Sequence, residues 1–176
     1  DVRVIGNHVI AGHNSGTFLI SGGKAVYLSR ISGAFSITRD VGDEDGFLQC
    51  TYSNLVKYKL ENGVLKQNRV FYNFNELIRF IETDHLGNIW LAHMHRGLFQ
   101  LRYNTARDSV RLKRYIDSFV INEIRPNLRV FKINERVVFT SGKGLFTYDD
   151  LHDTIIPYVT LNIKLGKFSQ ATRIIP

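Results

Sequence analysis

The amino-acid sequence predicts an all-β fold, and its local pattern is the first reason. Short runs rich in Val, Ile, Phe and Tyr alternate with Gly, Asn, Asp and Ser, as in 8–12 (HVIAG) and 136–141 (RVVFTS). Apolar residues rarely keep helical spacing for more than two turns, and the best helical candidate is 73–82 (NFNELIRFIE). The chain is therefore expected to consist of many short strands.

A repeat along the chain is the second reason. When Gly16, Asn54, Gly97 and Gly144 are aligned, apolar residues recur two and four places after them and seven places before them. Residues two and four places after each aligned residue share one strand face, because successive side chains alternate between faces. The three columns are Phe18, Val56, Phe99 and Phe146; Ile20, Tyr58, Leu101 and Tyr148; and Val9, Phe47, Trp90 and Val137.

The length of the repeat predicts the architecture. A period of roughly 40 residues with four strands per unit is typical of a β-propeller blade, a sheet that must stack on neighbours to hide both faces. Because propellers close with about 4 to 8 blades, we expect an open arc cut from a larger propeller; pairing with a second copy is the alternative. The prediction is an all-β β-propeller fragment of about four four-stranded antiparallel blades, at 1–33, 34–76, 77–122 and 123–165. The outermost strand of the fourth blade is expected at 155–161. Residues 166–176 are expected to start a further blade, with 171–176 (ATRIIP) as its first strand.

The composition is that of one folded domain. The 176 residues are 44% hydrophobic and 22% charged. The only cysteine, Cys50, excludes an internal disulfide framework and is expected as a buried core thiol. No run approaches the roughly 20 apolar residues of a membrane helix, and the N-terminal DVRVIGNHVI lacks the pattern of a signal peptide. We expect any export signal or membrane anchor to lie outside this chain.

The motifs predict no catalytic residue, no metal site and no cofactor. The patterns G-x-S-x-G, H-E-x-x-H, the P-loop and paired zinc-binding cysteines are absent. His93 and His95 are two places apart on a predicted strand and could share a metal ion if a third ligand came from elsewhere. Packing of His93 in the column of Gly12, Cys50 and Thr140, with His95 in a polar turn, explains both histidines without a metal.

Two more residues of the same segment have alternative roles. Trp90 could stack on a sugar, but its column with Val9, Phe47 and Val137 favours core packing. Asp84, close to Gly87 and Asn88, could belong to a calcium loop. A β-turn in which the Asp84 side chain accepts hydrogen bonds from nearby backbone N–H groups needs no ion and is favoured.

This segment also resembles a known repeat. DHLGNIW at 84–90 followed by RGLFQL at 96–101 is similar to the two-component regulator propeller repeat, and 11–20 and 137–158 resemble its neighbouring blades. Asn54 and Thr17 depart from the Gly and Leu of that pattern. The resemblance is carried by Asp84, Gly87, Asn88, Ile89, Trp90, Gly97, Leu98 and Phe99.

The resemblance implies a role and a location. Repeats of this kind build the periplasmic sensor region of inner-membrane hybrid two-component systems (histidine kinase/response regulator) in glycan-degrading bacteria. In that family two large propellers are followed by a β-sandwich, a membrane helix, and cytoplasmic kinase, receiver and DNA-binding parts. None of the parts that follow the propellers is expected in this chain. The segment is thus expected to recognise an oligosaccharide without catalysis of its own. Rearrangement of a receptor homodimer would carry the signal across the membrane and so regulate transcription.

Candidate ligand-binding residues lie in the predicted turns between the second and third strands of the blades. Propeller ligands usually contact the face that includes these turns, because loop sequence can vary without disturbing the stacked sheets. Polar, aromatic and basic side chains there suit hydroxyl-rich or acidic sugars; surface turns are polar in most proteins, which is the alternative explanation. The candidates are His13, Asn14, Tyr52, His95, Arg96 and Lys143.

The formal charge of +7 favours acidic partners without naming one. Basic residues outnumber acidic ones between Arg102 and Lys143, which suggests an acidic oligosaccharide; alternatively, 111–114 (RLKR) protects the edge of an outer strand. Nucleic-acid binding is not predicted, because there is no compact basic helix and no basic ribbon interleaved with aromatics. Two other functions stay open: a protein-interaction propeller without a small ligand, and a propeller lyase or glycosidase.

Overall fold

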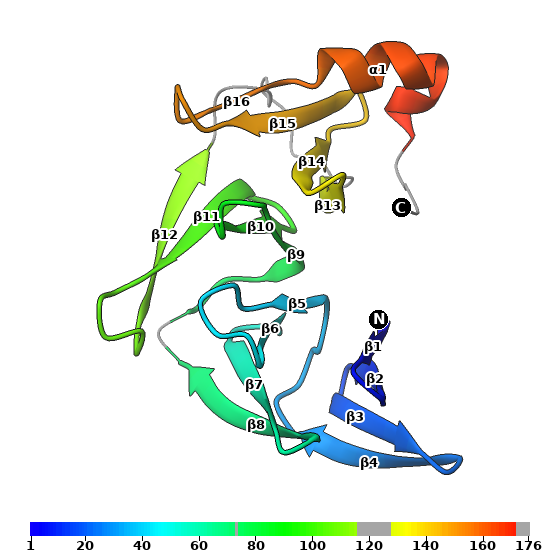
Figure 1. Ribbon diagram of the computed structural model, residues 1–176, viewed down its shortest axis with the longest axis vertical. Coiled ribbons are helices and arrows are strands. Elements are labelled where there is room, and N and C mark those ends of the chain that lie inside the picture. The colour runs from blue at the N-terminus through cyan, green and yellow to red at the C-terminus, as the bar shows by residue number, and fades with distance from the viewer. Residues whose placement is uncertain (73, 116–127, 172–176) are drawn as a thin grey trace. The chain divides into compact units, whose positions relative to one another are not determined.

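The computed structural model describes residues 1–72, 74–115 and 128–171, and Figure 1 labels the elements that they form. They build four four-stranded antiparallel sheets, in each of which the strands follow one another in chain order. This arrangement confirms the predicted all-β fold of four propeller blades.

The strands of blades one and two are β1 (Val2–Ile5), β2 (His8–His13), β3 (Gly16–Ser21) and β4 (Lys24–Ser29), then β5 (Ile37–Arg39), β6 (Gly46–Cys50), β7 (Leu55–Glu61) and β8 (Val64–Phe71). Those of blades three and four are β9 (Ile78–Thr83), β10 (Ile89–His93), β11 (Gly97–Tyr103) and β12 (Val110–Tyr115), then β13 (Arg129–Ile133), β14 (Arg136–Thr140), β15 (Leu145–Asp149) and β16 (Thr154–Pro157). An α-helix, α1 (Val159–Leu165), and a 3-10 helix, η1 (Gly166–Gln170), follow β16.

The chain folds as two compact units. Unit one contains Asp1–Ile81 and Tyr103–Val110, and unit two contains Glu82–Arg102 and Arg111–Pro176. The strands of blades one and two therefore belong to unit one, and those of blade four to unit two.

The core of unit one joins blades one and two. Ile5 and Ile10 of blade one belong to one apolar cluster with Phe47, Val56 and Tyr58 of blade two. Each of these side chains is 6% exposed or less. Because burying an apolar side chain of this size contributes about 1.5–3 kcal/mol, the cluster is the main attraction between the two blades.

Polar groups buried at this contact satisfy one another. The Thr17 hydroxyl lies 2.6 Å from Gln49 Oε1, and the Tyr58 hydroxyl lies 3.0 Å from Thr17 Oγ1 and 2.8 Å from Gln49 Oε1. Burial raises the pKa of Tyr58, so its hydroxyl stays protonated and able to donate. The neighbouring Cys50 is fully buried, which raises the pKa of its thiol and confirms the predicted core thiol.

A second polar cluster of unit one surrounds Asp40, whose side chain is fully buried. Its carboxylate lies 2.8 Å from Lys57 Nζ, 2.7 Å from Arg107 Nη2 and 3.1 Å from the Tyr103 hydroxyl. Burial and the Asp40 carboxylate raise the pKa of Tyr103, while the hydrogen bond from Lys57 lowers the pKa of Asp43. A buried carboxylate with this many donors tolerates poorly the loss of any one of them, because the remaining charge stays buried.

The core of unit two is built around Trp90, which is fully buried. Its ring centroid lies 4.6 Å from that of Tyr148 and 5.2 Å from those of Tyr115 and Phe139. Tilted aromatic pairs at such distances add about 0.5–1.5 kcal/mol each beyond the burial of their area. Core packing of Trp90 is thus confirmed, and the alternative of an exposed sugar-stacking platform is wrong.

Asp84 organises the turn between β9 and β10. Its Oδ1 accepts hydrogen bonds from the backbone N–H groups of Leu86 at 3.0 Å and Asn88 at 2.8 Å. Its Oδ2 accepts from the Asn88 side chain at 2.9 Å and from Trp90 Nε1 at 2.8 Å. Both carboxylate oxygens are therefore committed to the turn and to the core tryptophan. The predicted β-turn is confirmed, and it explains why Asp, Asn and Trp occur together in this motif.

A third carboxylate joins blades three and four within unit two. Asp153 accepts hydrogen bonds from the hydroxyls of Tyr115 at 2.6 Å and Tyr148 at 2.9 Å, and it pairs with Lys113. The hydrogen bond from Lys113, followed by that from Tyr115, lowers the pKa of Asp153 to about 2. The rings of Tyr115 and Tyr148 also contact Trp90, so this polar group lies beside the aromatic core.

The helical candidate at 73–82 is wrong. Ile78–Thr83 forms strand β9, in which Ile78 and Ile81 are buried, and in the described part of 73–82 no helix is present. The β-branched residues of this segment suit a strand, and burial in the sheet outweighs the weak helical spacing.

The expected outer strand of blade four at 155–161 is too long. β16 ends at Pro157, and the next backbone N–H, that of Tyr158, still donates to the Leu145 carbonyl at 2.9 Å. The chain then turns into α1, which begins at Val159, and the Asn162 side chain also bonds the Leu145 backbone, accepting from its N–H at 2.9 Å and donating to its carbonyl at 2.8 Å. The strand expected at 171–176 lies outside the described residues except for Ala171, and no helix among the described residues is long and apolar enough to cross a membrane.

We predict that Asp84→Ala destabilises the chain by about 3 kcal/mol, because buried donors, including Trp90 Nε1, lose their acceptor. Urea unfolding followed by tryptophan fluorescence measures the loss. Asp150→Ala, at an exposed position of the β15–β16 turn, is the matched control and should change the free energy of unfolding by less than about 0.5 kcal/mol. Equal stability of the two variants would contradict the assigned role of Asp84.

Acid is predicted to remove the contribution of Asp153. Its pKa is lowered from 3.8 to about 2, so the folded chain gains stability above the unfolded pKa and loses it as the pH falls through about 2. The Asp153 and Lys113 side chains are 45% and 42% exposed, so solvent screening keeps this contribution small. The difference in urea midpoint between the chain and Asp153→Asn should shrink from about pH 5 to about pH 2. A difference that stays constant over that range would refute the assignment.

Candidate functional site

The candidate ligand-binding residues lie in the turns that connect the second and third strands of each blade, which we call the B–C turns and describe separately for each unit. These turns join β2 to β3, β6 to β7, β10 to β11 and β14 to β15. The residue that opens each turn uses its side chain to bond the turn's own backbone. These opening residues are His13, Thr51, His93 and Ser141.

The two opening residues in unit one, which we call capping residues because they bond the turn backbone, show this arrangement. His13 Nδ1 accepts from the Ser15 backbone N–H at 3.2 Å and lies 2.9 Å from the Ser15 hydroxyl. Thr51 Oγ1 accepts from the Asn54 backbone N–H at 3.0 Å and donates to the Asn54 carbonyl at 2.9 Å. A side chain that satisfies the turn backbone fixes the shape of a short loop.

The capping residues of unit two also accept hydrogen bonds from the backbone of their own turns. His93 Nδ1 lies 2.9 Å from the backbone nitrogens of both His95 and Arg96, and it accepts from both. Ser141 Oγ accepts from the Lys143 backbone N–H at 3.3 Å. Because the lone pair of His93 Nδ1 is used inside the turn, that nitrogen cannot coordinate a metal while the turn keeps this conformation.

The predicted columns are wrong for the second strand of blade three. β10 pairs with β11 through His93↔Gly97, which encloses Met94, His95 and Arg96, whereas the other blades close shorter turns. The extra residue shifts every β10 side chain by one place relative to β11. Trp90 therefore takes the position of Val138 instead of Val137, and His93 takes that of His13, Thr51 and Ser141 instead of Gly12, Cys50 and Thr140.

Three of the predicted site residues lie together in unit one. The Tyr52 hydroxyl donates to Asn14 Oδ1 at 3.2 Å and so links the B–C turns of blades two and one. His13 is adjacent to Asn14, and all three side chains are exposed, Tyr52 by 43%. Their exposed edges present an aromatic ring, an imidazole and an amide on turns whose backbones are fixed.

The linker between blades one and two positions Tyr52, which sequence reasoning does not predict. Gly33 has a φ of +79°, and a Cβ there would overlap the Tyr52 ring. Its N–H bonds the Asn14 carbonyl at 2.8 Å, and the ring of Phe35 lies edge-on to Tyr52 with centroids 5.4 Å apart. The tyrosine is therefore held between a glycine and an aromatic ring. A glycine in a linker gives no signal of this contact, since the contact comes from tertiary packing.

The other three predicted residues lie in unit two. Arg96 and His95 are exposed in the B–C turn of blade three, and the Arg96 guanidinium lies 5.8 Å from the Phe99 ring centroid. Arg114 donates to the Arg96 carbonyl at 2.9 Å, which adds a second cation beside this turn. Lys143 is exposed in the B–C turn of blade four. These turns offer positive charge, whereas those of unit one offer uncharged polar groups and an aromatic ring.

Part of the basic excess between Arg102 and Lys143 is used in ion pairs. Arg107 pairs with buried Asp40, Lys113 with Asp153, and Lys132 with Glu135 at 2.9 Å. Cations neutralised in this way attract an acidic ligand less. The basic excess is therefore a weaker indication of an acidic ligand than the sequence count alone implies.

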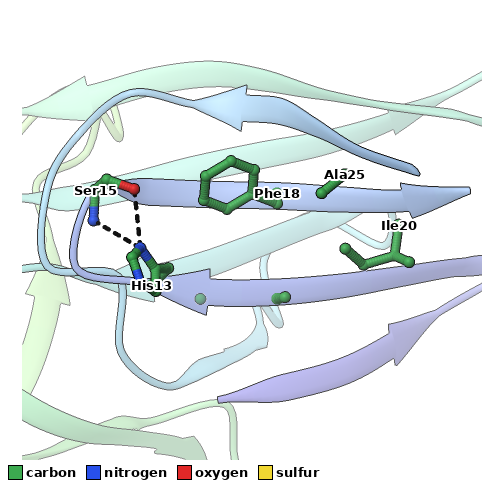
Figure 2. A pocket seen from close by; sticks show the side chains of 7 residues that line it. His13, Ser15, Phe18, Ile20 and Ala25 are labelled. Atoms are coloured by element: carbon green, nitrogen blue, oxygen red, sulfur yellow. Dashed lines mark hydrogen bonds between the residues drawn. The ribbon is translucent and has the colours of Figure 1, made fainter. Parts of the chain in front are cut away.

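A hollow of about 330 Å³ lies on one face of blade one, and Figure 2 shows its lining side chains. Phe18, Ile20 and Ala25 make its floor apolar, and the hydrogen-bonded pair His13 and Ser15 lies at one end. The hollow thus reaches from the sheet to one B–C turn.

Comparison with known proteins identifies the fold. No protein-family model and no curated protein matches the chain. The extracellular domain of the proposed hybrid two-component system BT4673 from B. thetaiotaomicron is 14% identical with a TM-score of 0.61, over 89% of this chain and 21% of that chain. The extracellular domain of the proposed hybrid two-component system BT3049 from the same organism is 17% identical with a TM-score of 0.58, over 89% of this chain and 21% of that chain. A proposed 6-phosphogluconolactonase from Bacteroides uniformis is 10% identical with a TM-score of 0.53, over 86% of this chain and 50% of that chain.

At these identities the likeness shows the fold alone. The fold is shared by extracellular domains of two-component systems and by a protein named for an enzymatic activity. This chain spans about a fifth of the length of the two extracellular domains, 21% in each case.

We predict that Gly33→Ala displaces Tyr52 and destabilises the chain by about 2–3 kcal/mol, since a left-handed backbone and a clash with the ring act together. Gly63→Ala is the matched control, because Gly63 also has a left-handed φ, +76°, but has open space around the position of a Cβ. It should lose only the backbone part, about 1 kcal/mol. Urea unfolding compares the two, and equal losses would show that Gly33 does not position the tyrosine.

Proposed function

We propose that this chain is part of the periplasmic ligand-sensing region of a hybrid two-component receptor, and that its B–C turns bind an oligosaccharide. The observation that carries the proposal is a set of exposed side chains on capped turns, above sheets whose cores are buried. The likeness in fold to extracellular domains of two-component systems supports the sensing role. Other parts of the receptor would supply the membrane anchor, the histidine kinase and the homodimer contact.

The chemistry of the turns supports a sugar as ligand. Tyr52 offers a ring edge and a hydroxyl, and the Asn14 amide and the His13 imidazole can donate to or accept from sugar hydroxyls. In unit two, the turns that carry Arg96, His95 and Lys143 offer hydrogen-bond donors and positive charge of their own, which suits a uronic acid or a sulfated sugar. Fixed turn backbones reduce the entropy cost of binding, because little ordering is left to occur.

The second candidate function is a protein-interaction module without a small ligand. Exposed apolar side chains favour it: Val159, Ile163 and Phe168 of the C-terminal helices are 58%, 77% and 66% exposed. Val159 and Ile163 lie one turn apart on α1, and exposed apolar surface marks interaction sites in many proteins. Failure of every oligosaccharide tested to bind, together with capture of a defined protein partner, would favour this alternative.

Tyr52→Ala is predicted to weaken oligosaccharide binding about three- to ten-fold, because the Tyr52 hydroxyl and its exposed ring edge are lost. Tyr72→Ala, at a tyrosine that is 74% exposed outside the B–C turns, is the matched control and should bind as the unchanged chain does. A thermal-shift screen of plant and host oligosaccharides selects the ligand, and calorimetry on the sensor region that contains this chain measures its affinity. Equal affinities of the two variants would exclude Tyr52 from the site.

The salt dependence of binding tests the acidic-ligand proposal separately. If Arg96 and Lys143 contact an acidic sugar, affinity should fall as salt rises, and Arg96→Ala should reduce that dependence. A neutral ligand would bind equally at low and high salt. That result would remove the acidic ligand while leaving oligosaccharide sensing intact.

A further inference from the structure

A buried histidine closes the B–C turn of blade three. His93 is 7% exposed, and its Nδ1 accepts hydrogen bonds from the backbone N–H groups of His95 and Arg96, each at 2.9 Å. Two N–H groups that point at one nitrogen require its lone pair, so the imidazole is neutral and carries its proton on Nε2. The closed turn and a protonated imidazole therefore exclude each other.

A second proton on His93 reverses the role of Nδ1 from acceptor to donor. Both turn N–H groups would then lose their acceptor, and a positive charge would be added to a buried ring. An imidazole in contact with water takes up this proton at about pH 6.5. Mild acid is thus sufficient to favour an open turn, in which the ring is hydrated and charged.

The nearest charged groups of the described residues do not stabilise a charged ring. On the turn itself, the ring centroid of His95 lies 6.4 Å from that of His93. On β11, Phe99 lies 5.9 Å from His93, centroid to centroid. The guanidinium groups of Arg96 and of Arg114 on β12 lie 5.8 and 5.9 Å from the Phe99 centroid. Positive charge around this phenyl ring opposes a further charge on the imidazole.

The other two strands beside β10 carry charged residues as well. β9, paired with β10, carries Arg79 and Glu82, and β13, which also contacts β10, carries Arg129 and Lys132. Cations outnumber the single carboxylate on these two strands. They therefore give no electrostatic reason for His93 to keep a second proton in the closed turn.

The capping residues of the other blades do not respond to mild acid in this way. Thr51 and Ser141 accept through hydroxyl oxygens, which do not titrate. His13 Nδ1 accepts from the Ser15 N–H at 3.2 Å, but it also lies 2.9 Å from the Ser15 hydroxyl, which can accept from a protonated ring. The expected response to acid is therefore specific to blade three.

We propose that the B–C turn of blade three is a pH-gated element, which protonation of His93 opens in mild acid. The closed turn presents His95 and Arg96, two exposed candidate ligand contacts, on one fixed backbone. Opening releases both from that arrangement, so the affinity for a ligand that this turn holds falls as the pH falls. This consequence for affinity rests on the proposed function, whereas the opening of the turn does not.

Amide hydrogen exchange of the 176-residue chain without any ligand tests the opening. Protection factors are compared, because they remove the effect of pH on the intrinsic exchange rate. Those of the His95 and Arg96 amides should fall about ten-fold between about pH 7.5 and about pH 5.5, since an imidazole with an ordinary pKa of about 6.5 is about ten times more often charged than neutral at the lower pH. Nitrogen-15 NMR of the imidazole should show His93 as the neutral Nε2–H form at the higher pH.

Two variants separate His93 from the other histidines. In His93→Asn the asparagine Oδ1 can accept at the place of Nδ1 and does not titrate, so the protection factors of the His95 and Arg96 amides should stay constant over this pH range. His85→Asn is the matched control, because His85 is exposed in the β9–β10 turn of the same blade. Its replacement should leave the ten-fold fall in place.

Three results would overturn the proposal. The first is constant protection of the two amides in the unchanged chain. The second is a fall that His93→Asn retains or that His85→Asn abolishes, because the proton would then act on another group. The third is a His93 that carries its proton on Nδ1, or two protons, at the higher pH. That form is read from the unchanged chain, so the third result does not depend on the folding of a variant.

Discussion

Burial of both faces of each four-stranded sheet is the constraint on which this structure depends. A single blade can hide neither face, so its strands alternate between two sets of side chains that each need a neighbouring blade. In unit one this requirement is met by the cluster that Ile10 of blade one and Phe47 and Tyr58 of blade two share. In unit two it is met by the aromatic group around Trp90. The free energy of folding thus comes from contacts between blades more than from any blade alone.

Carboxylates give these apolar contacts their specificity. Asp40, Asp84 and Asp153 each gather donors from separate strands or turns, and two of them bring together groups far apart in the chain. An apolar contact by itself tolerates sliding, whereas a carboxylate with several donors fixes one register. These interactions lie outside the B–C turns, whose shape depends instead on their capping residues and, for Tyr52, on packing against Gly33.

Local features of this fold are predictable from the sequence, and features that depend on distant segments are not. Alternation and a repeat of about 40 residues suffice for the number of blades, and the Asp84 turn is predictable because all its partners lie within a few residues. The Asp40 cluster is not, since Arg107 lies 67 residues away. The column of Trp90 is mispredicted because an alignment anchored on Gly97 cannot detect one extra residue in the preceding turn. The same holds for the candidate binding residues. The positions of the B–C turns are predictable from the repeat, whereas the support of Tyr52 by Gly33 is not, because it arises from tertiary packing.

The contacts between blades also explain why the repeat is imperfect. Thr17 departs from the leucines of its column, Leu55, Leu98 and Leu145, and its hydroxyl is the partner of Gln49, which is equally exceptional, and of Tyr58. Blades one and two are thus matched through these polar side chains, so a change on one side of this contact requires a compensating change on the other. A propeller built in this way has an order of blades that its side chains encode. The B–C turns keep their shape mainly through their own capping residues, so ligand-contacting side chains can differ between blades while the strands stay in register.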